Sequence, residues 1–201
     1  MYQIVGLFFV FLIGLQIEPQ NAYYGNSYIR LEHKTKPLQY WLKVIPNFHE
    51  LIYKGDVTIE IIVKESTNKI MLLCNYVEID DVQLLDDKGT EVNKSINIIE
   101  HLGILNIYTA KNLTVERTYK IRVAFHNDLF FRKSGFFLSY YLENTGKKLA
   151  ALTHMEPTRA RFVFPCYDEP EFKAKFTISV ARQSYEICHS NMPLAFTSKK
   201  E

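Results

Sequence analysis

Hydrophobic and polar side chains alternate with a period of two over most of the chain from Tyr40 onward. In GDVTIEIIV (residues 55–63), Val57, Ile59 and Ile61 share one face, which predicts a strand with one solvated face. The other face carries Asp56, Thr58 and Glu60. Similar runs are KIMLLC (69–74), YVEIDDVQLL (76–85), INIIEHLGILNIYT (96–109), YKIRVAFHNDLF (119–130), KKLAALT (147–153) and FKAKFTISVA (172–181). The β-strand is therefore the expected secondary structure throughout.

Turn-forming sequences separate these runs, such as DDKG at residues 86–89 and NTG at residues 144–146. No segment repeats apolar residues at the helical period over a long distance. Many short strands without long helices predict an all-β fold, mostly antiparallel, built as a sandwich or a curved sheet. After about residue 30 there is no repeat, low-complexity segment or linker, so one domain is expected to continue to the end.

The N-terminus departs from this pattern, because Ile4–Leu15 is an unbroken apolar run of 12 residues and the first charged residue is Glu18. A membrane-spanning helix needs roughly 20 residues. We therefore predict a cleaved secretory signal over residues 1–22, with small Ala22 marking the cleavage position. An uncleaved membrane anchor stays open as the alternative, since no Lys or Arg precedes the apolar run.

The composition is that of an ordinary globular protein, with 47% hydrophobic and 14% aromatic residues among 201. The 24 basic and 22 acidic residues are mixed along the chain and leave a formal net charge of +2. No basic run is present that would follow a phosphate backbone, so nucleic acid is not an expected partner.

Two N-glycosylation sequons, NKS at Asn93 and NLT at Asn112, lie in polar stretches and support secretion. With the apolar leader, they predict a protein that is secreted or held at the extracellular face of the plasma membrane. The three cysteines are odd in number and lack CxxC spacing, so they permit at most one internal disulfide. Buried free thiols are the default interpretation.

Two short sequences resemble parts of zinc sites. HELIY at His49–Tyr53 begins like H-E-x-x-H, but its second histidine is missing, and the surrounding Pro46, Asn47 and Gly55 predict a hairpin turn. His154, Glu156 and Cys166 match the start of a zinc-deaminase pattern, but Glu169 stands where its second cysteine is required. Neither sequence predicts a metal site in this chain.

The segment 153–182 has an unusual composition and then ends as an ordinary strand. Its three prolines, Pro157, Pro165 and Pro170, each remove a backbone donor, so an ordered but irregular connection is expected. Charged side chains are expected to pin this connection through hydrogen bonds, and phenylalanines are expected to anchor it in the core. These residues are Arg159, Arg161, Asp168, Glu169 and Glu171, with Phe162, Phe164 and Phe172.

The sequence EPTRARFVFPCYDEPEFKAKFTISVAR (156–182) closely resembles the EPT-x-AR-x-x-FPC-x-DEP-x-FKA-x-F signature of the N-terminal domain of the M1 zinc aminopeptidases, the aminopeptidase N type. The resemblance also includes SGFFLSYY (134–141), YKGDVTIEIIV (53–63) and HSNMP (189–193). It covers roughly Arg30 to Pro193, nearly everything after the predicted signal.

This resemblance implies a saddle-shaped, mostly antiparallel β domain over residues 23–201 that packs on a separate catalytic domain and closes one side of its cleft. In the family, the zinc ligands, the general base and a G-x-M-E-N motif for the peptide's amino end lie in that catalytic domain. This chain is therefore expected to hold no metal or catalytic residue, to be truncated at its C-terminal end, and to be inactive alone.

Two substrate-binding residues are implied by the same resemblance. In the family's T-Q-x-E-P pattern the glutamate pairs with the α-ammonium group of the peptide, and Glu156 matches it. The position of the glutamine, which lines the first side-chain pocket, is occupied by His154, a departure that changes the pocket's size and allows it to carry charge. A structural ion pair of Glu156 with Arg159 or Arg161 remains the competing explanation for Glu156, and a hydrogen-bonded loop histidine without a substrate role remains the alternative for His154.

The sequence thus predicts the substrate-cleft domain of a zinc aminopeptidase that removes N-terminal residues from peptides, with the enzyme's own catalytic domain and peptide N-termini as partners. The alternative is a non-catalytic, aminopeptidase-like binding module that retains this β domain.

Overall fold

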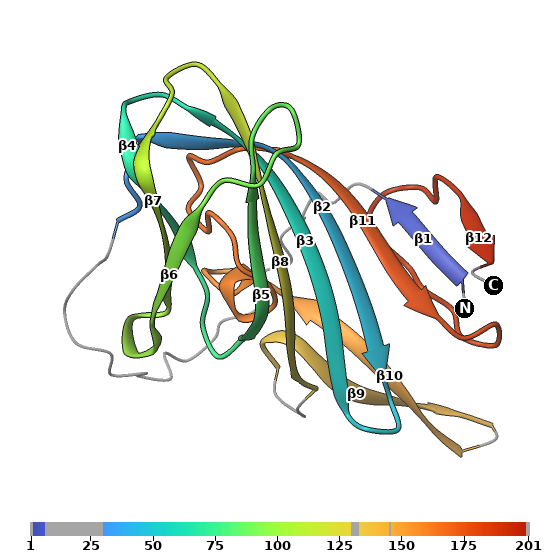
Figure 1. Ribbon diagram of the computed structural model, residues 1–201. Helices are drawn as coiled ribbons and strands as arrows, with labels where there is room; N and C mark the ends of the chain where they lie inside the picture. Colours follow the sequence, from blue (N-terminus) through green and yellow to red (C-terminus); the bar gives the residue numbers. More distant parts are fainter. Residues whose placement is uncertain (1, 7–29, 130–132, 145, 200–201) are drawn as a thin grey trace.

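The computed structural model describes residues 2–6, 30–129, 133–144 and 146–199 (Figure 1). The strands are β1 (Tyr2–Gly6), β2 (Thr35–Asn47), β3 (Ile52–Val63), β4 (Thr67–Leu73), β5 (Glu78–Leu85), β6 (Lys94–Ile99), β7 (Ile104–Leu113), β8 (Thr118–Asp128), β9 (Gly135–Glu143), β10 (Gly146–His154), β11 (Lys175–Arg182) and β12 (Thr197–Lys199). Two short 3-10 helices, η1 (Glu100–Leu102) and η2 (Ala160–Phe162), are the only helices in these ranges. The predicted all-β class is confirmed.

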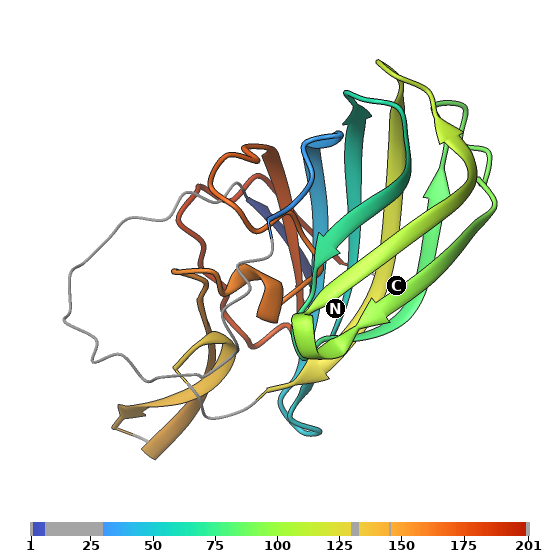
Figure 2. The ribbon, with the colours of Figure 1, turned by 90° about the vertical axis from the view of Figure 1, so that its left-hand side faces the viewer.

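The strands form three sheets. The largest has seven strands in the order β12-β1-β11-β2-β3-β8-β5, the second has the order β4-β7-β6, and the third is the hairpin β9–β10. Every described pairing is antiparallel except that of β11 with β2, which is parallel. Figure 2 shows the three-stranded sheet against the seven-stranded sheet, as in a β-sandwich.

The core lies between these two layers and forms one cluster. In β3, the alternate residues Val57, Ile59 and Ile61 are fully buried, as the period of two predicts. They pack in the same cluster as apolar residues of β4, β7 and β8. Burial of this alternating aliphatic face is the main force that holds the two layers together.

The run 96–109, which looks continuous in sequence, is two strands. Gly103 adopts a left-handed conformation with φ of 64° directly after η1, and this lets the chain reverse so that β6 and β7 pair. A side chain at Gly103 would also collide with Asn75. Apolar residues on both sides of the reversal conceal it in the sequence pattern.

The predicted hairpin turn at HELIY is confirmed. His49 lies in the turn between β2 and β3, where Asn47 Oδ1 accepts hydrogen bonds from the backbone N–H groups of His49 and Glu50 at 3.0 and 3.1 Å. This is an Asx-type turn, whereas a zinc-protease motif requires a helix at this position.

The predicted signal falls mostly outside the described residues, as does its cleavage position at Ala22. Only its beginning is described: β1 pairs with β11 on one side and with β12 on the other. Within the described ranges, no helix has the length and hydrophobicity needed to cross a membrane.

Candidate functional site

The connection between β10 and β11 is irregular but tightly attached to the core. Cys166 exchanges two backbone hydrogen bonds with Leu73 of β4, at 2.9 and 3.0 Å. The Tyr40 hydroxyl accepts a hydrogen bond from the Tyr167 backbone N–H at 3.1 Å, and the Tyr53 hydroxyl donates to the Val163 carbonyl at 2.9 Å. These strand residues satisfy backbone groups that the loop itself cannot pair.

The predicted phenylalanine anchors divide into two groups. Phe164 and Phe172 are buried in the core cluster, where Phe164 makes an edge-to-face contact with Tyr40 at 6.3 Å between ring centroids. Phe162 is half-buried and supports the guanidinium of Arg159, which lies 4.8 Å from its ring centroid. Phe164 and Phe172 therefore attach the loop to the core, and Phe162 supports Arg159 at the loop surface.

The loop's charges form a network, as predicted. Arg161 Nε donates to Asp168 Oδ2 at 2.8 Å, and Arg161 Nη2 donates to the Asp168 carbonyl at 2.8 Å. Glu169, whose side chain is only 8% exposed, accepts a 2.8 Å hydrogen bond from the Leu31 backbone N–H and lies 3.5 Å from Arg30. These contacts hold the segment after η2 in place, because Asp168 is bonded to Arg161 and Glu169 is bonded to Leu31.

Local sequence patterns did not predict two sets of contacts. These are the contacts of Glu169 with Arg30 and Leu31, and the hydrogen bonds between the loop backbone and the hydroxyls of Tyr40 and Tyr53. Leu31 and Glu169 are far apart in the chain, and a strand tyrosine looks like any other core aromatic. Only the tertiary structure brings these groups together. A lone tyrosine among aliphatic strand residues is the one available signal, since a buried hydroxyl requires a partner.

Glu156 lies in the turn directly after β10 and is exposed. Among the described residues it forms no ion pair, because Arg161 is engaged by Asp168 and Arg159 lies over Phe162. In the described residues, Glu156 therefore does not form the structural ion pair with Arg159 or Arg161 that was the competing explanation. The turn itself is set by a 2.8 Å hydrogen bond from the Arg159 backbone N–H to the Met155 carbonyl.

His154 is the last residue of β10 and is also exposed. Its Nδ1 lies 3.4 Å from the Lys133 carbonyl oxygen, a long contact at the base of the β9–β10 hairpin. His154 and Glu156 are thus two residues apart at one end of β10, and both are open to solvent. Both sequence-predicted residues are therefore accessible in this chain.

The residues of the deaminase-like pattern do not fit a metal ion. Cys166 is buried, and this burial raises the pKa of its thiol well above the ordinary value. His154 and Glu156, in contrast, are exposed. Across the described ranges, no group of three His, Cys, Asp or Glu side chains is arranged to hold a metal.

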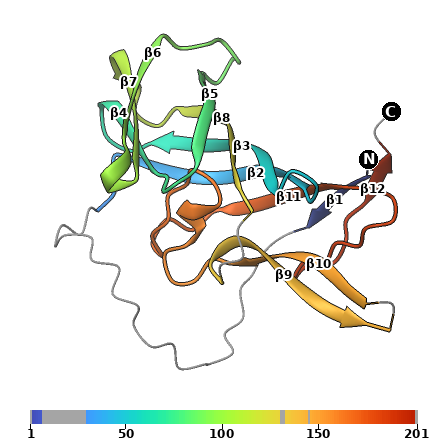
Figure 3. The same cartoon turned by 90° about the horizontal axis from the view of Figure 1, so that it is seen from below.

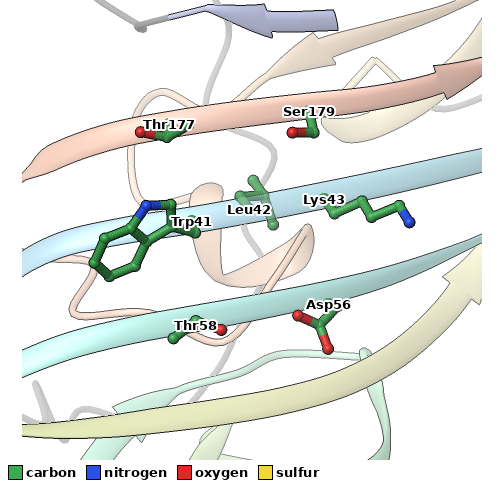
Figure 4. A pocket seen from close by; sticks show the side chains of 7 residues that line it. All are labelled: Trp41, Leu42, Lys43, Asp56, Thr58, Thr177 and Ser179. Carbon is green, nitrogen blue, oxygen red and sulfur yellow. The ribbon is translucent and has the colours of Figure 1, made fainter. Parts of the chain in front are cut away.

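One open groove of about 210 Å³ lies on the outer face of the seven-stranded sheet (Figure 4). Its lining comes from β2, β3 and β11 and consists of Trp41, Leu42, Lys43, Asp56, Thr58, Thr177 and Ser179. Neither His154 nor Glu156 belongs to it. The groove is therefore separate from the candidate site.

Comparison with known proteins agrees with the fold. The chain matches the Peptidase M1 N-terminal domain family over residues 36–201. It is 29% identical to the human thyrotropin-releasing hormone-degrading ectoenzyme over 83% of this chain and 16% of that protein. It is 32% identical to the membrane alanyl aminopeptidase of Manduca sexta, over 84% of this chain and 19% of that protein.

A third relative is the human endoplasmic reticulum aminopeptidase 2, which is 32% identical over 86% of this chain and 19% of that protein. The chain therefore spans less than a fifth of the length of these relatives. The family match, in contrast, covers most of the chain and all of the strands from β3 onward. This chain belongs to the Peptidase M1 N-terminal domain family.

Proposed function

We propose that this chain forms one wall of the substrate cleft of a zinc metalloaminopeptidase, which removes N-terminal residues from peptides once the chain is joined to its catalytic domain. The observation that carries this proposal is Glu156, an exposed carboxylate that has no ion pair with another described residue and that precedes a tightly anchored loop. The kinetic effect of removing this carboxylate tests the proposal directly.

An exopeptidase must distinguish a free amino terminus from an internal peptide bond. A carboxylate in a fixed position does so by forming a charge-assisted hydrogen bond with the α-ammonium group, which an internal peptide bond lacks. The anchored loop supplies that fixed position, since its backbone is hydrogen-bonded to β4 and to two buried tyrosines. Glu156 would thus position the substrate, with His154 beside its first side chain.

The catalytic domain would hold the zinc ion and the general base. The isolated 201-residue chain is therefore expected to bind no stoichiometric zinc and to hydrolyse no aminoacyl substrate. Metal analysis of the purified chain and an assay with aminoacyl-coupled chromogenic substrates check this. One tightly held zinc per chain would assign a catalytic role to this segment and contradict the proposal.

The proposed location is outside the cell or at the extracellular face of the plasma membrane. Both sequons suit this location, because Asn93 lies exposed in the connection between β5 and β6, and Asn112 lies exposed in β7. The names of two relatives describe an ectoenzyme and a membrane aminopeptidase.

Expression in secretory cells is expected to yield a chain that starts near Tyr23 and carries glycan at Asn93 or Asn112. The apolar leader directs export, and both sequons become accessible to the glycosylation machinery. N-terminal sequencing and the mass shift after glycosidase treatment measure the two events. An intact, unglycosylated chain that retains Met1 in the cytosol would contradict this location.

A further inference from the structure

The groove on the outer face of the seven-stranded sheet is built around Trp41, the only tryptophan of the chain. Trp41 follows Tyr40 in β2, and successive strand residues point to opposite faces of a sheet. The Tyr40 hydroxyl accepts a hydrogen bond from Tyr167 in the β10–β11 connection, so Trp41 faces away from that connection. Figure 3 shows the connection and the β9–β10 hairpin together on one side of β2 and β11. The groove therefore lies on the opposite side of the sheet.

The centre of the groove is an accessible aromatic ring between two hydroxyl groups. Trp41 is 36% exposed, and Figure 4 shows its indole with one ring face turned toward the viewer. The strand register places Thr58 of β3 on one side of Trp41 and Thr177 of β11 on the other. Thr177 Oγ1 accepts a 3.3 Å hydrogen bond from Gln39 Nε2, so the Thr177 hydroxyl proton can be donated to a ligand.

One cation lies near this ring and would have to move for a ligand to stack on it. The Lys120 ammonium is 5.6 Å from the centroid of the Trp41 ring and 4.0 Å from Glu60 Oε1. The Lys120 side chain is 48% exposed, and exposed contacts of both kinds are weak. A ligand that covers the indole therefore displaces Lys120 readily.

Two opposite charges flank the ring without pairing. Two residues after Trp41, Lys43 stands directly between Asp56 of β3 and Ser179 of β11 in the strand register. Opposite charges at facing strand positions stabilise a sheet when they pair. Neither Lys43 nor Asp56 forms an ion pair with a described residue, however, and their polar groups point in different directions in Figure 4. Both groups are thus open to a ligand, and together they add no net charge to the lining.

These features match the chemistry of a neutral sugar ring. The C–H groups on one face of a pyranose are weakly positive and stack on the negative face of an aromatic ring. The sugar hydroxyls both donate and accept hydrogen bonds, which suits a carboxylate, an ammonium and hydroxyl groups in one lining. A strong anion fits less well, because the carboxylate of Asp56 balances the one ammonium of the lining. A peptide strand cannot pair with β2 here, because β3 and β11 occupy both of its edges.

We propose that this groove binds one neutral pyranose ring of a glycan, stacked on Trp41 and hydrogen-bonded to the charged and hydroxyl groups around it. The groove volume of about 210 Å³ is below the roughly 300–1,000 Å³ of pockets for drug-sized molecules, which agrees with a single ring. This site goes beyond the proposed peptide cleft, and its function depends on neither Glu156 nor a catalytic domain.

The test is titration of the 201-residue chain with the methyl glycosides of mannose, galactose and N-acetylglucosamine. At least one glycoside is expected to change the fluorescence of Trp41, the only indole in the chain, and to show saturation transfer from the protein in NMR. Trp41→Ala is expected to weaken the binding measured by NMR at least about tenfold, because the stacking surface is lost. Trp41→Tyr, which retains an aromatic ring, is expected to weaken it by less than about threefold.

The matched control is Tyr140→Ala. Tyr140 is another exposed aromatic residue, at 56%, and the Lys147 ammonium lies 4.6 Å from its ring centroid, but it is not part of the groove. This variant is expected to bind the glycosides as the wild type does. Equal losses in Trp41→Ala and Tyr140→Ala would mean that exposed aromatic rings bind these sugars nonspecifically, and this would overturn the proposal.

The titration is carried out on protein from secretory cells before and after enzymatic removal of N-linked glycans, which identifies the source of the sugar. Binding only after this removal would show that the chain's own glycan at Asn93 or Asn112 fills the groove, whereas binding to both forms indicates a glycan of another molecule. The absence of fluorescence change and saturation transfer with all three glycosides after this removal would refute the site. Binding that Trp41→Ala leaves unchanged would place the sugar elsewhere and refute it as well.

Discussion

Replacing Glu156 by alanine in the full-length enzyme is expected to lower kcat/KM for aminoacyl substrates by about 30-fold to several thousandfold. This is the range that loss of one partner of a desolvated charge pair produces. The carboxylate is exposed in this chain, but a bound peptide and a catalytic domain would cover it. Steady-state kinetics of the wild type and the variant measure the change.

The matched control is Glu65→Ala, which removes another exposed carboxylate that has no ion pair with a described residue. Glu65 lies in the connection after β3, far along the chain from the anchored loop. The control is expected to retain kcat/KM within about threefold, which corresponds to under about 1 kcal/mol. If Glu156→Ala melts like the wild type and also stays within this limit, Glu156 has no role in substrate binding.

Replacing Asp168 by alanine is expected to lower the free energy of unfolding by about 2–3 kcal/mol, somewhat less than the roughly 3–5 kcal/mol for a fully buried ion pair. The Asp168 and Arg161 side chains are 15% and 19% exposed, so the guanidinium left behind would be only partly solvated. For a domain of this size, such a loss lowers the Tm by about 4–12 °C. Thermal unfolding followed by circular dichroism measures it.

Glu171→Ala is the control for this comparison. Glu171 also belongs to the loop, but its side chain is 44% exposed and its contacts with Arg30 and His33 are long, at 3.8 and 3.5 Å. Such a surface pair contributes less than about 1 kcal/mol. Equal Tm changes in the two variants would show that the Arg161–Asp168 pair does not hold the loop.

Alternation along the chain predicted the strands that have one buried and one solvated face, as in β3, because burial on one side imposes a period of two. The pattern fails at β9, where GFFLSYYLE has apolar residues at consecutive positions. The structure gives the physical reason: the hairpin is buried on both faces at its base and exposes apolar side chains on both faces beyond it. The period of two therefore fails where a strand does not bury one face along its whole length.

Like the strands, the candidate site was predicted from the sequence only in part. The three prolines and the dense charges indicated an ordered loop held by opposite charges, and the structure shows such a contact between Arg161 and Asp168. The sequence could not show that Glu169 would pair near the N-terminal end of the domain, since that contact depends on the tertiary fold. The substrate roles of Glu156 and His154 remain predictions.

The parallel pairing of β11 with β2 has a consequence for the order of events during synthesis. β2 ends at Asn47 and β11 begins at Lys175, so residues 48–174 must be made before this pair can form. At ribosomal rates of roughly 5–20 residues per second, that takes about 6–25 s. β3 can pair with β2 early through the hairpin, but the other edge of β2 stays vacant throughout this interval. An unpaired edge is a site of aggregation, so we expect that the nascent domain needs an edge-shielding chaperone until β11 emerges.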